Sequence, residues 1–410
     1  MNTSSKILND PIHGFIRLPK GIIFDLIEHP YFQRLRRISQ LGLSSLVYPG
    51  AYHTRFHHAI GAMHLMTKAI ESLRAKGHEI TEEESIGAEI AILLHDIGHG
   101  PFSHALEHSI SHNISHEQIS SLFMKKLNQE FDGKLSLAIQ IFEGNYKKNF
   151  LHQLVSSQLD VDRMDYLKRD SFYSGVQEGT IGAERIIHML NIVDDNLVVE
   201  SKGIYSVEKF LIARRLMYWQ VYFHKTVVCA EQMLIQILKR AKELSQKRVE
   251  LFTTTALKEF LENNYTLNDF EEKQSVFNAF TQLDDFDIMT CIKQWKDHND
   301  IILSTLSNNI IDRKLFKVIV NDKPFNAEEV NSIKEQVKIK YSLNSSDLDY
   351  MVIEGQISND AYKLNDSDIK ISYKDGSLLD ISQASDQDAI SAISKKVKKF
   401  FICYPKDFKN

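Results

Sequence analysis

The clearest candidate for chemistry is an adjacent pair, His95 and Asp96, which ends the apolar run in the segment AILLHDIGHGPFSH. Polar side chains at the end of a buried helix cost free energy unless their atoms are used. A divalent cation would use them, because imidazole nitrogen and carboxylate oxygen together suit zinc, manganese, iron or magnesium. The alternative is structural: Asp96 would cap the helix and His95 would be a hydrogen-bonded core histidine.

Two more residues favour the metal. His58 lies near the start of the segment TRFHHAIGAMHL, and Asp162 lies in LDVDRMDYLKRD. Asp162, Tyr166 and Asp170 are spaced i, i+4, i+8 and therefore share one helix face, which would otherwise be a solvated acidic stripe. Two histidines and two aspartates from three helices leave positions open for water and substrate, as a catalytic metal site requires. More than half of the 17 histidines also fall between residues 53 and 116.

These residues depend on helices to position them. Apolar residues recur at helical spacing, and residues 82–95 are apolar on most faces, which is typical of a buried helix. The pattern predicts an almost purely helical first half, with helical segments at 20–47, 56–75, 82–95, 115–130, 134–143, 150–170 and 205–247, the last of them as one or two long helices.

The C-terminal quarter has a different pattern. Strands are expected at 314–320, 350–356 and 400–403, helices at 327–338 and 387–399, and a hairpin joins 369–373 to 378–381 around Lys374-Asp375-Gly376-Ser377. The fold class is therefore mostly α, with a smaller C-terminal α+β domain. The expected units are a core at 1–230, a helical extension at 231–305 and the α+β domain at 306–410.

Composition narrows the function classes. No apolar run approaches the eighteen or so residues of a membrane helix, and the N-terminal segment lacks a signal pattern. The cysteines Cys229, Cys291 and Cys403 are too far apart for a thiolate zinc motif, so we expect a cytoplasmic protein without disulfides. A net charge of −5 argues against a nucleic-acid coat protein.

The order H…HD…D is the signature of the HD-domain superfamily, and the surrounding blocks are more specific. In this respect the chain resembles the sterile-alpha-motif/HD-domain dNTP triphosphohydrolases and bacterial HD-domain dNTPases. The blocks are NDPIHGFIRL (9–18), FQRLRRISQLG (32–42), YPGAYHTRFHHAIG (48–61), LLHDIGHGPFSH (93–104), SHEQ (115–118), LDVDRMDYLKRD (159–170), YFHK (222–225) and RKLFKVI (313–319).

The resemblance implies a helical HD core that cleaves dNTP to deoxynucleoside and triphosphate. It implies one tightly bound divalent metal ion per subunit, of unspecified identity among Mn, Mg, Fe, Zn, Ni and Co, with extra Mg on the triphosphate. The implied ligands are His58, His95, Asp96 and Asp162. Control of the dNTP pool, or antiviral defence by dNTP depletion, would follow.

The resemblance also implies roles for other residues. His104 is the expected proton donor, with Glu107 and His116 completing a relay. Arg163 stands where the family has lysine, which would replace a point charge with a bidentate contact. The expected substrate contacts are Gln40, Leu41, Arg55, His99, Arg163, Tyr166, Asp170, Arg214, Tyr222 and Lys225.

Regulation is expected by the same resemblance. An activating nucleotide would bind between subunits of a homo-dimer or homo-tetramer, through Asn9, Glu28, Gln33 and Arg36. Glu28 stands where the animal enzyme has aspartate, which puts guanine specificity in doubt. The alternative is that Arg34, Arg36 and Arg37 form a solvated basic helix face.

Three other functions share the metal pattern. One is a phosphatase acting on nucleoside mono- or diphosphates or another small nucleotide. A second is a single-strand nuclease, which the acidic net charge and the lack of a stacking platform disfavour. A third is a nucleotide sensor with a degenerate site, which the presence of all four ligands disfavours.

Overall fold

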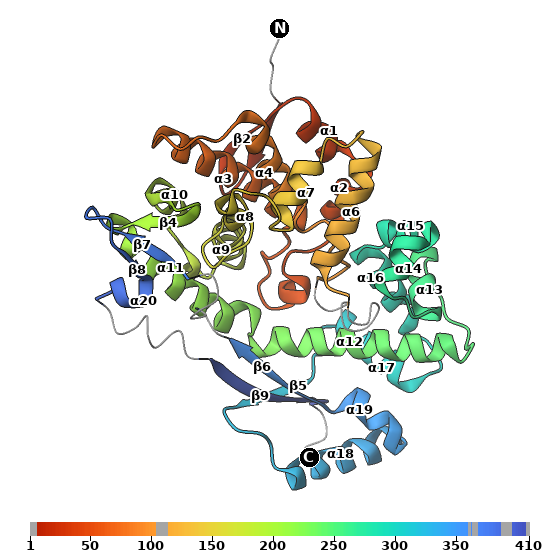
Figure 1. Ribbon diagram of the computed structural model, residues 1–410. Helices are drawn as coiled ribbons and strands as arrows, with labels where there is room; N and C mark the ends of the chain where they lie inside the picture. Colours follow the sequence, from red (N-terminus) through yellow and green to blue (C-terminus); the bar gives the residue numbers. More distant parts are fainter. Residues whose placement is uncertain (1–5, 104–113, 360–361, 363–367, 387–395, 407–410) are drawn as a thin grey trace.

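The computed structural model describes residues 6–103, 114–359, 362, 368–386 and 396–406. It is mostly helical with small sheets, which confirms the predicted fold class (Figure 1). The long helix α12 lies between the N-terminal helices at the top of Figure 1 and the three-stranded C-terminal sheet at the bottom.

Three helices form the centre of the N-terminal part: α3 (Arg55–Ala75), α4 (Glu82–Leu94) and α9 (Val161–Ser174). Helix α3 packs against both others. A capping box of Thr81 and Glu84 starts α4, and Asp160 caps α9 by accepting a hydrogen bond from Arg163 N. The surrounding elements are β1 (Lys6–Asp10), β2 (Gly14–Leu18), α1 (Ile22–Glu28), α2 (Pro30–Gln33), the 3-10 turns Arg34–Arg37 and Gly42–Leu46, α6 (His116–Glu130), α7 (Ser136–Phe142) and α8 (Asn149–Val155).

The middle of the chain continues in helices. The predicted helical region 205–247 is α11 (Ile204–Met217) and α12 (Lys225–Gln246), separated by a π-helical turn over Tyr218–Tyr222. Such turns often occur at functional sites. The other elements are the 3-10 turn Gln177–Gly179, α10 (Ala183–Met189), β3 (Leu190–Val193), β4 (Asn196–Glu200), the 3-10 turn Ser201–Gly203, α13 (Thr255–Glu262), α14 (Leu267–Glu272), α15 (Gln274–Gln282), α16 (Asp285–Trp295) and α17 (Ile301–Ile311).

The C-terminal strands belong to two separate sheets. One is antiparallel, in the order β5-β9-β6, formed by β5 (Lys317–Asn321), β9 (Val397–Tyr404) and β6 (Ile353–Asn359). The other is β3-β4-β7-β8, in which β7 (Lys370–Ser372) runs parallel to β4 and pairs with β8 (Leu378–Asp380). The remaining elements are α18 (Ala327–Tyr341), the 3-10 turn Ser345–Asp347, α19 (Leu348–Met351) and α20 (Ile381–Ala384). The predicted domain boundary near residue 306 falls within α17.

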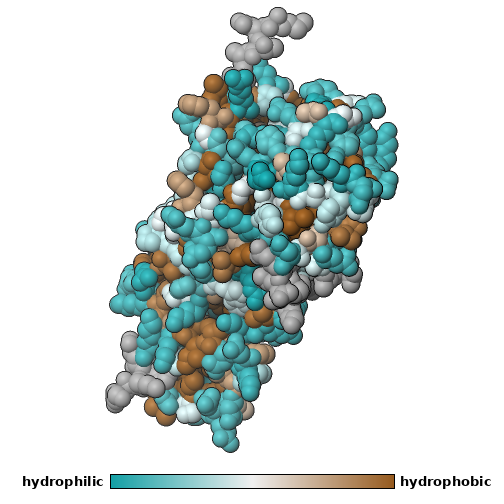
Figure 2. Space-filling model, turned by 90° about the vertical axis from the view of Figure 1, so that its left-hand side faces the viewer, coloured by the Kyte–Doolittle hydropathy of each residue, from teal (hydrophilic) through white to brown (hydrophobic). Residues whose placement is uncertain are grey.

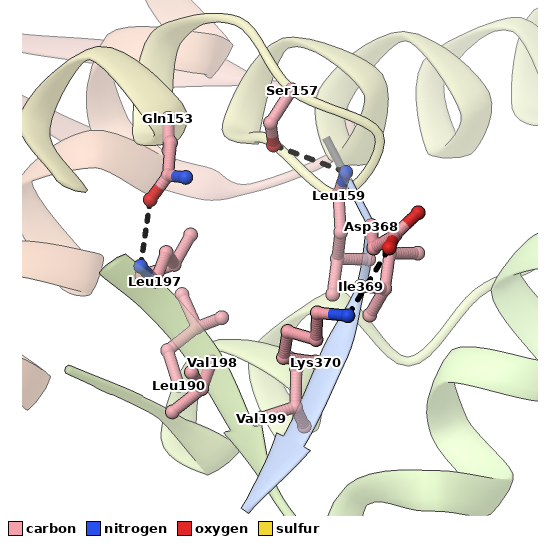
Figure 3. A pocket seen from close by; sticks show the side chains of 10 residues that line it. All are labelled: Gln153, Ser157, Leu159, Leu190, Leu197, Val198, Val199, Asp368, Ile369 and Lys370. Carbon is pink, nitrogen blue, oxygen red and sulfur yellow. Dashed lines mark hydrogen bonds and ion pairs between the residues drawn. The ribbon is translucent and has the colours of Figure 1, made fainter. Parts of the chain in front are cut away.

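A small pocket marks the seam between β4, β7 and the α8–α9 connection (Figure 3). Its polar groups are already paired: Gln153 Oε1 accepts from Leu197 N at 2.7 Å, and Lys370 Nζ lies 3.1 Å from Asp368 Oδ2. None of the residues with a predicted role lines it. The pocket is a packing gap at the seam and is separate from the predicted chemistry.

The structure corrects three expectations of secondary structure. The first half is not almost purely α, because it contains the β1–β2 and β3–β4 hairpins. Asp194 and Asp195 both adopt positive φ, so they make the tight turn for which glycine and asparagine are the usual signals. The strand expected at 350–356 begins only at Ile353, after α19. Residues 397–399, expected to be helical, belong to β9, and the rest of that segment up to 395 lies outside the described residues.

The surface in Figure 2 is hydrophilic over most of the visible face, with apolar side chains in separate areas. Among the described residues, no helix is both long and apolar enough to span a membrane. All three cysteines, Cys229, Cys291 and Cys403, are buried and free.

Candidate active site

The structure brings the predicted metal ligands together from α3, the end of α4 and the first turn of α9. Single ligand atoms of His58, His95 and Asp162 lie within 4.8 Å of one another. His58 Nε2 is 3.0 Å from Asp162 Oδ1 and 3.4 Å from His95 Nε2. The carboxylate of Asp96 joins them, with Oδ1 3.4 Å from His95 Nε2 and Oδ2 3.7 Å from His58 Nε2.

The opposite nitrogens of both imidazoles are occupied. His95 Nδ1 donates to the Ile92 carbonyl at 2.6 Å, and His58 Nδ1 donates to Asp165 Oδ2 at 2.9 Å. Because Nδ1 carries the proton in each ring, the neutral forms present the Nε2 lone pair to the centre. Two lone pairs and two carboxylates that converge in this way fit a divalent cation.

The pKa shifts of His58 and Asp162 also favour a cation at the centre. Burial would lower the pKa of His58, but Asp162 and Asp165 raise it to about 10. Burial would raise the pKa of Asp162, but hydrogen bonds to His58 and His95 lower it overall. The cluster therefore demands positive charge, and a metal ion would displace a proton to supply it.

A second cluster adjoins the first, with ligand atoms of Asp96, His99 and His116 within 4.8 Å of one another. His99 Nε2 is 3.3 Å from Asp96 Oδ1, and the rings of His99 and His116 stack at 3.8 Å. The block SHEQ is a capping box that makes His116 the first residue of α6. The other two members of the predicted relay, His104 and Glu107, lie outside the described residues.

A close approach between α6 and the end of α4 holds this cluster. Ser120 Oγ donates to the His95 carbonyl at 2.7 Å and accepts from Gly98 N at 2.9 Å. A Cβ at Gly98 would lie 2.4 Å from the His116 carbonyl oxygen. Gly98 therefore permits the contact between the helices.

Several of the predicted substrate contacts gather beside α9. Asp170 accepts from His53 Nε2 at 2.7 Å and from the Tyr222 hydroxyl at 2.8 Å. The ring of Tyr166 lies 6.2 Å from that of Tyr222. Gln40 is held by its backbone N to the His53 carbonyl, while its side-chain Oε1 is buried with no hydrogen-bond partner among the described residues. Leu41 is buried next to it.

Four of the predicted substrate contacts are cationic, and they differ in whether other side chains already bind them. Arg55 is buried and already bonded to Asp96 and to Ser103 Oγ. Arg163 pairs with Asp160 through Nη1, but its Nε is buried without a partner in the described structure. Arg214 on α11 is buried, and its Nε and Nη1 have no partner among the described groups. Lys225 is exposed at the first position of α12.

Arg214 and Arg163 both lie near the Tyr166 hydroxyl. Burial raises the pKa of the Tyr166 hydroxyl, and both guanidiniums, together with Asp162, are close enough to act on it electrostatically. Tyr166 lies one turn from Asp162 on α9 and 6.4 Å from the His58 ring. The donors without a partner therefore lie near Tyr166, which follows the proposed ligand Asp162 by one turn of α9.

Sequence analysis missed residues that support the site from a distance. Arg34 is fully buried and donates to the carbonyls of Leu283, Ile97 and His99. Asp285 on α16 accepts from Ser39 N at 2.8 Å and from Phe102 N at 2.7 Å, which ties the Gln40 turn to the backbone after Gly100. Their partners are far away in the sequence, so no local pattern indicates them.

The expected regulatory residues lie on the surface near the N-terminus. Arg36 Nε donates to Gln33 Oε1 at 2.8 Å, and Gln33 Nε2 donates to the Ile27 carbonyl at 2.7 Å. Asn9 and Glu28 are exposed. The alternative of a solvated basic face does not hold for all three arginines, because Arg34 is buried and Arg37 pairs with Asp284.

Comparisons with known proteins agree with this geometry. The model of the HD domain family matches residues 55–170, and that of the HD associated region matches residues 181–265. A phosphohydrolase from Bacteroides thetaiotaomicron, solved by crystallography, is 52% identical, has a TM-score of 0.95, and is matched over 98% of this chain and 100% of its own.

Curated relatives extend the comparison. The chain is 31% identical to the uncharacterized protein YwfO of Bacillus subtilis, over 99% of this chain and 93% of the relative. It is 35% identical to a Dictyostelium discoideum homolog of the deoxynucleoside triphosphate triphosphohydrolase SAMHD1, over 58% of this chain and 50% of the relative. It is 29% identical to human SAMHD1, over 58% of this chain and 45% of the human protein. The chain thus spans about half the length of these two triphosphohydrolases.

Proposed function

This chain belongs to the HD-domain family of phosphohydrolases, and we propose that it hydrolyses deoxynucleoside triphosphates to a deoxynucleoside and triphosphate. The proposed metal ligands are His58, His95, Asp96 and Asp162. The observation that carries the substrate class is the buried guanidinium of Arg214, whose Nε and Nη1 have no hydrogen-bond partner among the described residues. A buried cation without a counter-charge is costly, and a polyphosphate would satisfy it with charge-assisted hydrogen bonds.

The chain's residues divide the work. A bound divalent cation would act as a Lewis acid at the α-phosphate. Arg214 and Arg163 donate to phosphate oxygens, and Gln40 Oε1, which has no partner among the described residues, accepts from a sugar hydroxyl. Asp170 and Tyr222 form the wall on which the sugar lies. Leu41 closes the space at C2′. A water molecule attacks the α-phosphorus, and His104 protonates the departing 5′-oxygen.

The deciding experiment is incubation of the protein with each of the four dNTPs, singly and mixed, with Mn²⁺ or Mg²⁺, followed by chromatographic identification of the products. We expect intact triphosphate and the matching deoxynucleoside. Orthophosphate would instead indicate a phosphatase acting on another bond, and nucleotides released only from single-stranded DNA would indicate a nuclease. Either result contradicts the proposal.

We also propose that a nucleotide activates the enzyme within a homo-oligomer. The Gln33–Arg36 pair and the exposed Asn9 and Glu28 support this, because they present polar groups that the metal centre does not use. In the same experiment, dNTP mixtures should then be hydrolysed faster than single dNTPs. The mass of the protein in solution should be larger than that of one chain when nucleotide is present.

Replacing the proposed proton donor by His104→Ala is expected to lower turnover by roughly a hundredfold or more, because a general acid usually contributes that much. Metal content and substrate affinity should persist, since neither depends on this proton. Turnover at saturating dNTP is the measurement. His78→Ala is a control, because His78 bonds to Asn191 outside the site. Near-normal turnover of His104→Ala would assign the protonation to another group.

Sugar selection is tested by Leu41→Ala. Loss of this wall should relax discrimination against ribonucleoside triphosphates by about 1–3 kcal/mol, or roughly 5- to 150-fold in the ratio of kcat/KM values. Leu43→Ala is the matched control, because Leu43 is also buried but follows the turn that carries Gln40. If both variants shift the ratio equally, or neither does, Leu41 does not face C2′.

A further inference from the structure

Behind the candidate metal centre lies a buried polar network that the sequence analysis did not find. Its hub is Asp165, one turn after Asp162 on α9 and fully buried. One carboxylate oxygen accepts from His58 Nδ1 at 2.9 Å and from Arg169 Nε at 2.8 Å. The other accepts from His13 Nε2 at 2.7 Å and from Arg169 Nη2 at 3.0 Å.

The network continues into the N-terminal hairpin. Arg169 Nη1 donates to Asp10 Oδ2 at 2.8 Å. Asp10 Oδ1 accepts from the backbone N of Ile12 and of His13, each at 2.9 Å, so the same carboxylate folds the turn between β1 and β2. The side chains of Asp10, His13 and Arg169 are almost completely buried.

Helix α3 packs against Asp165 so closely that only glycine fits at position 61. A Cβ at Gly61 on α3 would lie 2.1 Å from Asp165 Oδ1 and 2.2 Å from Arg169 Nη2. Any larger residue would displace the hub. Gly61 and His58 belong to the same helix, so α3 supplies both a proposed ligand and the space for the residues that orient it.

The ionised hub determines how His58 faces the centre. Two hydrogen bonds from the Arg169 guanidinium, at 2.8 and 3.0 Å, balance the negative charge of the Asp165 carboxylate. An ionised Asp165 accepts the Nδ1 proton of His58 and leaves Nε2 as the lone pair. Carboxylate support of a ligand histidine typically changes metal affinity by about 10–100-fold.

We infer that the β1–β2 turn is part of the metal centre: Asp10 and His13 are positioning residues that act through Asp165 on His58, so divalent-cation binding and docking of the hairpin are linked. The inference rests on the proposed metal ligands but not on the substrate. By reciprocity, if the docked turn raises metal affinity, then bound metal must stabilise the docked turn.

The test uses the full chain and Mn²⁺ alone. Mn²⁺ affinity is measured from the spin-resonance signal of the free ion, and hydrogen exchange is followed at residues 6–18 with and without Mn²⁺. We expect His13→Ala to weaken Mn²⁺ binding about 10–100-fold. His13→Gln, whose side-chain amide can donate to Asp165 in place of Nε2, should recover most of the affinity. In the wild type, Mn²⁺ should slow exchange in the hairpin.

Controls separate positioning from folding. Arg17→Ala removes an exposed cation of the same hairpin and should leave Mn²⁺ affinity unchanged. If His13→Ala does not fold, Asp10→Asn replaces it, because the amide keeps an acceptor for the turn but loses the ion pair with Arg169. Wild-type affinity in the folded variant, or hairpin exchange indifferent to Mn²⁺, overturns the inference. A wild type that binds Mn²⁺ but does not cleave dNTPs would overturn only the proposed function.

Discussion

Replacing His95 and Asp96 together with alanine is expected to remove the bound metal ion and abolish phosphohydrolase activity, with the helical fold mostly intact. The pair supplies two of the four proposed ligands, and the remaining His58 and Asp162 would hold a divalent ion far more weakly. Both residues follow the last residue of α4, so truncation leaves its apolar faces in place.

Some loss of stability is expected in this variant, because Arg55 is buried and loses its partner Asp96. Metal content by mass spectrometry, product formation and helix content by circular dichroism are the measurements. His152→Ala is the matched control, since its Nδ1 meets the Ile141 carbonyl at 2.9 Å, much as that of His95 meets Ile92. An undiminished bound transition-metal ion in the double variant would show that the ligands lie elsewhere.

The second large effect is expected at Arg214. Each hydrogen bond from a guanidinium to a charged partner contributes about 1.5–3 kcal/mol. Two such bonds from Nε and Nη1 correspond to a fall of kcat/KM by roughly a hundredfold to ten-thousandfold in Arg214→Ala. Arg214→Lys should lie in between, because an ammonium cannot make the planar two-nitrogen contact.

Arg214→Ala should lower kcat/KM without lowering the stability of the protein. Without substrate, removal of a buried cation that has no ion-pair partner in the described structure relieves a desolvation cost, so the free energy of unfolding should stay equal or rise. Thermal unfolding of the substrate-free protein tests this beside kinetics. Arg215→Ala, a less buried neighbour on α11, is the control and should keep near-normal kcat/KM. A strong loss of stability with unchanged kcat/KM would make Arg214 a structural residue.

Local signals were sufficient for much of the helical framework. The boundaries of α4 follow from its capping box at Thr81 and Glu84 and from the end of its apolar run, since each depends on residues within one or two turns. The hairpin β7–β8 likewise follows from its turn residues. By contrast, the β3–β4 turn was missed because Asp194 and Asp195 adopt a conformation that their type only weakly predicts. The split of 205–247 at a π-helical turn also has no local sequence signal.

In the candidate site, too, some features follow from the sequence and others only from the tertiary structure. Residue types and spacing, with the resemblance, were enough to select His58, His95, Asp96 and Asp162, because a ligand's chemistry is a property of the side chain itself. Only the tertiary structure decided which nitrogen of each imidazole faces the centre, since that depends on Ile92 in the same helix and on Asp165 from another. It also decided that Arg55 is already paired, whereas Nε and Nη1 of Arg214 have no partner among the described residues. The role of His13 could not be inferred from sequence, because it depends on a hydrogen bond to Asp165, which is 152 residues away in the chain. Hydrogen bonds act over about 3 Å in space, and folding alone determines which distant residues come that close.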